Sequence, residues 1–182
     1  MAGQRRPKRY TIQEHRHRFA CWAAARAAQR GFAKTQVLVD ALEATELPAL
    51  VRRRSRWPRT ARAFETIHRR CCRSIQKSLR SNGIDTSFGR AAKLVAIYLK
   101  ATIVLEYADS AFASVVHPPF DALLLQQLAK TASAPPKTRA YWRRIRWTQL
   151  DEGEYYALVT SLRPLVADTP FWMLEQHWNP AR

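Results

Sequence analysis

The sequence predicts an all-α protein of about seven helices, folded as a single compact domain over residues 10–182. Helix start and stop signals recur along the chain, and no segment shows the sustained alternation of apolar and polar residues that is typical of strands. In addition, 47% of the 182 residues are hydrophobic, which is enough to bury one core. Residues 1–9 are basic, and we expect them to form a disordered arm before this domain.

The first predicted helix is "TIQEHRHRFACWAAARAAQRG", residues 11–31. Thr11 and Glu14 have the spacing of a capping box, in which each side chain bonds to the backbone amide of the other residue. Alanine-rich helix formers follow, and Gly31 suits the position just after a helix end. These signals define both ends of the helix.

Two further helices are predicted before residue 85. A short one covers "QVLVDALEA" (36–44), and the stretch 46–60, broken by prolines, predicts a partly helical connector. Thr60 then caps a third helix that runs to about Arg80, where "SNG" follows as a stop signal.

The fourth predicted helix is the most hydrophobic segment of the chain. Ser87 caps "FGRAAKLVAIYLKATIVLEYA" (88–108), whose apolar residues surround it almost completely, so we expect it at the centre of the fold. A loop then leads to Pro118 and Pro119, which suit the first positions of a fifth helix, "FDALLLQQLAK" (120–130).

The last third of the chain predicts a connector and two helices. "TASAPPKTRAYWRRIRW" (131–147) is broken by prolines and then becomes basic, which indicates a connector. A sixth helix is predicted over 150–165, and Pro170 starts a last short helix over 171–178.

The charge of the chain indicates a polyanionic partner. The 31 Lys and Arg residues outnumber the 14 Asp and Glu residues, and a formal charge of +17 destabilises a compact state unless a counter-charge or solvent screens it. Most of these cations are arginines, which bind phosphate in a bidentate manner and stack on bases, so nucleic acid is favoured over a membrane surface. Arginine-biased codon usage would also raise the charge, but it does not explain the clustering of the arginines.

Two stretches carry most of the predicted nucleic-acid contacts. The first lies between residues 52 and 80, and the arginines at its start are Arg52, Arg53, Arg54, Arg56 and Arg59. The second mixes cations with aromatic rings, as unpaired nucleic acid favours, and contains Lys137, Arg139, Arg143, Arg144 and Arg146 beside Tyr141, Trp142 and Trp147. Candidates for stacking on a base are Trp142, Trp147, Tyr155, Phe171 and Trp172. The alternative is that the aromatic rings belong to the core and the arginines form a solvated face.

No cofactor, metal site or export signal is expected. The three cysteines lack the CxxC or Cys/His spacing of zinc and iron–sulfur sites, and they are expected to be reduced thiols. The longest apolar run is interrupted by Lys100, and no apolar segment follows the basic N-terminus. We therefore expect a cytoplasmic monomer that does not span a membrane, nucleoid-associated if the protein is bacterial.

Two segments carry the candidate catalytic residues, "SFGRAAKLVAIYLK" and "HPPFDALLL". A glycine turn before an apolar helix with a lysine four residues later, and then a helix-start Asp after a His-Pro turn, resembles the helix–hairpin–helix base-excision DNA glycosylases (the HhH-GPD superfamily) over residues 84–131. The resemblance implies that Gly89 and Arg90 contact a DNA phosphate at the hairpin. It also implies that Lys93 is the nucleophile of a bifunctional enzyme and that Asp121 is the essential carboxylate. Because the cysteines of the iron–sulfur branch are absent, no cluster is implied.

Physical chemistry supports the same two residues. Breaking an N-glycosidic bond builds positive charge on the sugar, and a carboxylate at a helix N-terminus can stabilise that charge. A nucleophilic amine must be unprotonated, and the apolar surroundings of Lys93, or of Lys100 one heptad later, disfavour the charged ammonium. The alternatives are that Asp121 only caps its helix and that the lysines extend from a buried helix towards water. His117 is expected to satisfy the turn or to touch a phosphate.

These observations predict a DNA glycosylase, with or without lyase activity, that takes a damaged or modified base out of duplex DNA into a pocket. Two alternatives remain from the sequence. Arg62 and His68, six residues apart in "RAFETIH", fit the spacing of the HEPN ribonucleases, which would act on RNA. A basic helical module could also bind DNA or RNA without any chemistry.

Overall fold

The structure, a computed structural model, describes residues 10–29 and 31–179, and every regular element within these ranges is a helix. The predicted all-α fold class is therefore confirmed. The described part of the chain contains nine α-helices with five short 3₁₀ or π segments, more than the seven helices expected. The predicted arm over residues 1–9 lies outside the described residues.

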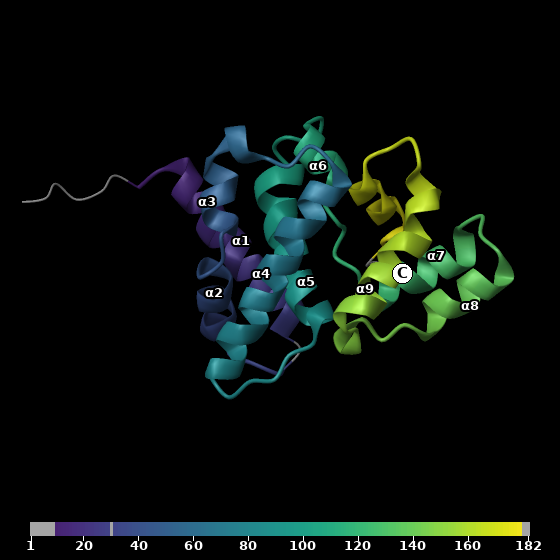
Figure 1. Cartoon of the computed structure of the whole chain (residues 1–182), viewed down its shortest axis with the longest axis horizontal. Helices are drawn as coiled ribbons and strands as arrows, with labels where there is room; N and C mark the ends of the chain where they lie inside the picture. Colours follow the sequence, from purple (N-terminus) through teal and green to yellow (C-terminus); the bar gives the residue numbers. More distant parts are fainter. Residues whose placement is uncertain (1–9, 30, 180–182) are drawn as a thin grey trace, which may run out of the picture.

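The N-terminal helices form one side of the molecule (Figure 1). They are α1 (Ile12–Gln29), α2 (Thr35–Glu43) and α3 (Leu47–Arg52), followed by the 3₁₀ turn η1 (Arg54–Arg56). The predicted start of α1 is confirmed, because the amide of Glu14 donates to Thr11 Oγ1 at 3.2 Å. The expected connector is helical where Pro48 lies within the first two positions of α3, positions that need no amide donor.

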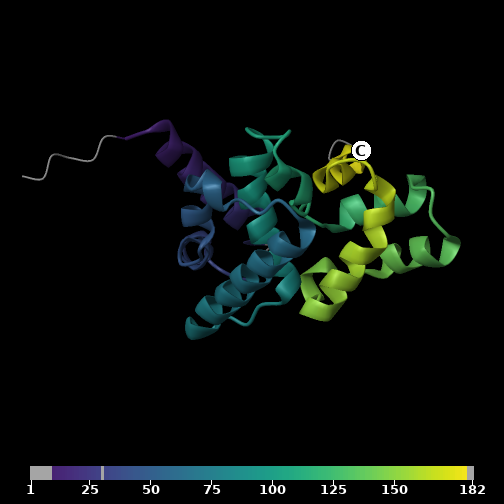
Figure 2. The same cartoon turned by 45° about the horizontal axis from the view of Figure 1, so that its top comes forward.

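Helices α4 (Ala61–Ser81) and α5 (Phe88–Leu99) follow, and α5 is central as expected. Thr60 and Ser87 cap them as the sequence predicts, each accepting a backbone N–H in the first turn. Ten of the twelve residues of α5 are buried, and the helix packs against α1, α4 and α9. In Figures 1 and 2, α5 lies between the N-terminal helices and the helices that follow it.

The predicted fourth helix changes character after Leu99. Lys100–Val104 form a π-helical segment, η2, in which the amide of Leu105 donates to Lys100 O at 3.0 Å. The wider turn directs the chain towards the short helix α6 (Ala111–Val115), which lies inside the stretch expected to be a loop.

Helix α7 (Ala122–Thr131) begins later than the sequence predicts. Pro118 and Pro119 do not occupy its first positions, because residues 116–121 form no regular helix and the N-cap is Asp121 in an extended conformation. The helix therefore starts directly after the carboxylate rather than before it.

The remaining helices cover the other side of α5. The expected connector over 131–147 instead contains α8 (Pro136–Arg144), which packs against α7, and the 3₁₀ turn η3 (Trp147–Gln149). They are followed by α9 (Glu152–Leu162), η4 (Arg163–Val166) and η5 (Phe171–His177), the last being 3₁₀ rather than α. No helix among the described residues has the length and apolarity needed to cross a membrane.

Candidate functional site

Two lysine–carboxylate pairs line one cavity of about 300 Å³. Lys93 on α5 pairs with Asp121 at the start of α7, and Lys100 on η2 pairs with Glu175 on η5. The remaining wall consists of Ala27, Ile97, Pro119 and Trp178. Charged groups from three separate regions of the sequence therefore converge on a single hollow.

Asp121 uses its two carboxylate oxygens for different purposes. Oδ1 accepts the backbone N–H of Leu124 at 2.9 Å and so caps α7, while Oδ2 accepts a hydrogen bond from Lys93 Nζ at 3.1 Å. The capping bond fixes the carboxylate, and the helix N-terminus favours its negative charge. Asp121 is thus both a helix cap and a cavity-lining ion, two roles that the sequence presented as alternatives.

Lys93 is held in a nearly closed environment. Its residue is only 7% exposed, its ammonium lies 4.5 Å from the centre of the Trp147 ring, and its neighbours on α5 are buried apolar residues. The ion pair and the aromatic face offset the cost of removing this charge from water. Lys93 is therefore positioned towards the cavity rather than extended to the surface.

The second pair in the cavity consists of Lys100, which the sequence named as an alternative amine, and Glu175, which it did not identify. Glu175 accepts a hydrogen bond from Lys100 Nζ. Burial raises the pKa of Glu175 above its ordinary value, and the hydrogen bond from Lys100 acts in the opposite direction. Glu175 lies on a short 3₁₀ helix without a recognisable motif, so sequence reasoning missed it.

The structure does not place Gly89 at a hairpin where its amide could hold a phosphate. Gly89 lies inside α5, and its N–H already donates to Leu150 O at 3.0 Å. A Cβ at this position would overlap the carbonyl oxygen of Trp147, so the glycine permits close packing of η3 on α5. The glycine that turns the chain between α4 and α5 is Gly83, with φ of 73°. The predicted phosphate contact of Gly89 is therefore corrected to a packing role.

Arg90, the neighbour of Gly89, also has partners within the protein. Its guanidinium lies 4.1 Å from the centre of the Phe32 ring and donates to Ala28 O at 3.4 Å. These contacts join α5 to the end of α1. Arg90 is half-buried, and both contacts engage its guanidinium within the protein.

Most of the predicted base-stacking rings belong to the core. Trp142, Trp147, Tyr155 and Phe171 are buried, and Trp142 Nε1 donates to Ser161 Oγ at 2.9 Å. Trp172 is half-buried. The aromatic ring that does line the cavity is Trp178, which is 40% exposed and was not among the candidates.

The predicted phosphate-binding arginines, in contrast, lie at the surface. Arg54 stacks on Tyr107, with 4.2 Å between its guanidinium carbon and the ring centre. The exposed members of the two predicted clusters include Arg52, Arg53, Arg54, Arg56, Arg59, Arg143, Arg144 and Arg146. These side chains are accessible to a polyanion.

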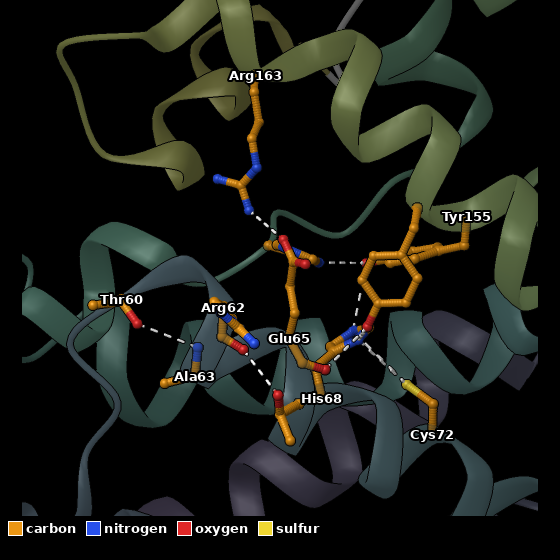
Figure 3. A network of polar contacts seen from close by, with 11 residues as sticks. Thr60, Arg62, Ala63, Glu65, His68, Cys72, Tyr155 and Arg163 are labelled. Carbon is orange, nitrogen blue, oxygen red and sulfur yellow. Dashed lines mark hydrogen bonds and ion pairs between the residues drawn. The ribbon is translucent and has the colours of Figure 1, made fainter.

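Arg62 and His68 do not share an exposed cleft. Arg62 is exposed, whereas His68 is 1% exposed and lies in a buried network between α4 and α9 (Figure 3). Its Nδ1 is 2.9 Å from the Tyr156 hydroxyl, and burial lowers its pKa to about 3. The arrangement required of the ribonuclease alternative is therefore absent from this pair.

The same network accounts for His117. Its Nδ1 lies 3.1 Å from the Tyr155 hydroxyl, and burial lowers its pKa well below the ordinary value. At the edge of the network, Arg163 at the start of η4 donates to Glu65 at 2.6 Å. Figure 3 shows the Arg163 side chain extending towards Glu65. His117 is buried and contacts Tyr155 on α9, so it is not accessible to a phosphate.

Comparisons with known proteins do not assign the chain to a family. No family model, curated protein or solved structure matches it.

Proposed function

We propose that the protein binds DNA and cleaves the N-glycosidic bond of a damaged or modified nucleotide, with Lys93 and Asp121 at the reacting sugar. The observation that carries this proposal is the 3.1 Å contact between Lys93 Nζ and Asp121 Oδ2 at the wall of a cavity of about 300 Å³. An amine and a fixed carboxylate are the two groups that glycosidic cleavage with a covalent intermediate requires.

The cavity suits a single flipped nucleotide better than a large ligand. Its volume lies at the lower end of the range for ligand sites, roughly 300–1,000 Å³. Trp178 offers an aromatic face at its wall, and Lys100 and Glu175 supply polar groups that can hydrogen-bond to the edge of a base. Under this proposal Trp178 replaces the buried rings as the stacking residue.

In the proposed reaction, the nucleotide leaves the duplex and its C1′ atom lies beside Lys93 Nζ. Asp121 accepts a proton from the ammonium, and the neutral amine forms a bond to C1′. The bond from C1′ to the base breaks, its electron pair leaves with the base, and the base takes up the proton that Asp121 received. Asp121 then carries a second proton from the nitrogen to the ring oxygen as the sugar ring opens, which leaves a protonated imine between C1′ and Lys93. If water attacks in place of the amine, the product is an abasic site and no covalent intermediate forms.

The exposed arginines support the binding half of the proposal. Eight of the predicted phosphate-binding arginines are accessible, and phosphate contacts dominate the affinity of proteins for duplex DNA. This surface alone would serve equally well in the second candidate function, a basic DNA- or RNA-binding module without chemistry. Only the charged side chains that line the cavity favour the enzyme over the non-catalytic module.

The test is a screen of purified protein against duplexes that each contain one damaged or modified base. We expect base release from at least one duplex, loss of release in Asp121→Asn, and DNA affinity that is unchanged or slightly raised. Asp151→Asn is the matched control, because Asp151 also caps a helix by accepting an amide, from Glu154 at 2.8 Å, but is exposed. Binding without base release across the screen would favour the non-catalytic module.

A further inference from the structure

A histidine, a cysteine and a glutamate meet where α1 contacts α2. His17 and Cys21 lie one turn apart on α1, and Glu43 is the last residue of α2. One ligand atom from each residue lies within 4.8 Å of the other two. Within residues 10–29 and 31–179, this is the one group of three or more His, Cys, Asp or Glu side chains that is arranged in this way.

From this arrangement we infer that His17 Nε2, Cys21 Sγ and Glu43 bind one divalent transition-metal ion of the zinc class. His17 Nε2 lies 3.2 Å from Glu43 Oε1 and 3.9 Å from Cys21 Sγ. A tetrahedral zinc ion with bonds of about 2.0–2.3 Å separates its ligand atoms by about 3.3–3.6 Å. The separation between His17 Nε2 and Glu43 Oε1 is close to this range, whereas the separation between His17 Nε2 and Cys21 Sγ is about 0.3 Å longer. Binding therefore requires the Cys21 thiol to move towards Nε2, and Glu43, whose side chain is 47% exposed, can adjust with it.

The surroundings orient the ligands as metal sites require. The Tyr98 hydroxyl lies 3.0 Å from His17 Nδ1, which leaves Nε2 to face Glu43. The Cys21 thiol lies beside the ring, 3.7 Å from Nδ1 and 3.9 Å from Nε2. Metal-bound histidines commonly use their second nitrogen in such a hydrogen bond, which fixes the ring. A thiolate and a carboxylate together also balance the two positive charges of the ion, so the site would be neutral.

The His17 side of the site borders a second cavity. His17 and Tyr98 both line a separate cavity of about 580 Å³ along α1. Three protein ligands leave a fourth tetrahedral position for water or for an anionic group that enters through this cavity.

The chain contains an internal comparison for this site. His68 and Cys72 on α4 have the same spacing as His17 and Cys21, with 3.7 Å between His68 Nε2 and Cys72 Sγ. Both nitrogens of His68 instead face tyrosine hydroxyls, and the pair is buried without a carboxylate in ligand position. A His-x₃-Cys pair is therefore not sufficient, and the third ligand from α2 distinguishes the proposed site. The sequence predicted no metal site at a cysteine because that prediction rested on the spacing of ligands along the chain. Such spacing does not identify Glu43, which lies on another helix.

The experiment uses the full chain without a histidine tag, freed of metal by a chelator and then titrated with Co²⁺ and Zn²⁺. We expect one equivalent of Co²⁺ to bind with a sulfur-to-cobalt charge-transfer band, and Zn²⁺ to displace it. Cys21→Ser should remove the band, and His17→Gln or Glu43→Gln should each weaken Zn²⁺ binding by about 10-fold or more. Cys72→Ser is the matched control and should leave the stoichiometry, the band and the affinity unchanged.

Each other outcome overturns the assignment. The site is wrong if Co²⁺ binds without the charge-transfer band, if the band survives Cys21→Ser, or if it disappears in Cys72→Ser. Glu43 is partly exposed, so Glu43→Gln should fold normally by circular dichroism, and unchanged Zn²⁺ affinity in that variant would also exclude the proposed ligand set.

Discussion

Asp121 joins Lys93 to the first turn of α7, although the two residues lie 28 positions apart in the chain. Because one oxygen receives the ammonium and the other receives the amide of Leu124, a change at Asp121 can remove one contact and preserve the other. Because the two oxygens have different partners, the ion pair and the helix cap can be tested independently.

Asp121→Asn should destabilise the fold by more than a cap substitution does. Asn caps helices about as well as Asp, but the neutral amide leaves the buried ammonium of Lys93 without its counter-charge. Fully buried pairs cost about 3–5 kcal/mol when broken, and the cavity beside this one lowers our expectation to about 2–4 kcal/mol. Urea unfolding measures the change, with Asp151→Asn expected to cost about 0.5 kcal/mol or less. Equal losses in the two variants would mean that the ion pair contributes nothing to stability.

Lys93 and Lys100 should differ in covalent chemistry although they line the same cavity. Under the proposed function, Lys93→Gln should abolish the adduct that borohydride traps between the protein and a substrate duplex. Lys100→Gln should retain the adduct, because Lys100 pairs with Glu175 and not with the helix-capping carboxylate. Gel electrophoresis after reduction detects the adduct, and its loss in Lys100→Gln alone would transfer the nucleophile to that residue.

Gly89→Ala should be strongly destabilising. The added methyl group would overlap the carbonyl oxygen of Trp147 and come within 3.2 Å of Leu150 Cβ, and a backbone atom cannot move aside as a flexible side chain can. We expect a loss of about 3 kcal/mol in the free energy of unfolding. Gly153→Ala on the exposed start of α9 is the control, and it should gain up to about 1 kcal/mol from helix propensity. Similar effects of both substitutions would contradict the close contact between α5 and η3.

Stability should fall as the pH drops from about 7 to about 5. Burial lowers the pKa of His68 to about 3 and that of His117 well below its ordinary value, so the unfolded chain binds more protons than the folded one between the two pKa values. The buried neutral histidines contribute fully to the free energy of unfolding above the pKa of unfolded histidine, near 6.5. Below that pH, each histidine lowers the free energy of unfolding by up to about 1.4 kcal/mol per pH unit. Unfolding by urea at several pH values gives the slope, which His68→Gln should reduce. His15→Gln, at an exposed histidine, should leave the slope as it is, and a flat profile for the unaltered protein would contradict the buried neutral pair.

DNA affinity should decrease steeply with salt, and the first arginine cluster should account for part of the slope. Replacing Arg52, Arg53, Arg54 and Arg56 by Gln removes up to four phosphate contacts and should reduce the slope of log K against log salt by up to about 3.6. A control with the same change in net charge replaces four exposed cations outside the two predicted clusters, namely Arg18, Arg26, Lys34 and Lys130. Filter binding at several salt concentrations compares the two, and equal slopes would show that net charge, not this surface, governs binding.

Local signals in the sequence were sufficient for the parts of the fold that depend on neighbouring residues. Thr60 and Ser87 cap the helices that they were expected to cap, because a cap needs only an amide three residues away. The same local pattern identified Asp121 as a helix-start carboxylate. Its placement beside Lys93 came only from a resemblance, since nothing in the spacing of the two residues requires contact.

The failures concern residues whose role depends on distant packing. Trp142 lies among arginines, but its own face of α8 is turned towards Ser161 on α9, and no local pattern distinguishes a buried ring in a basic segment from an exposed one. Glu175 reaches Lys100 across 75 positions of sequence, from a helix of 3₁₀ type that periodicity does not identify. The sequence predicted a turn at Gly89, whereas its role depends on close packing against the carbonyl group of Trp147, which local sequence does not predict.

The buried tyrosines and histidines of Figure 3 also share a small number of hydrogen atoms. The Tyr156 hydroxyl has one hydrogen and two neighbours that can accept it, the backbone oxygen of Glu65 at 3.3 Å and His68 Nδ1 at 2.9 Å. The Tyr155 hydroxyl lies in the same way between His68 Nε2 and His117 Nδ1. The tautomers of the two imidazoles are consequently coupled through tyrosine hydroxyls, so that a hydrogen placed on one ring limits where the hydrogen of the other can reside.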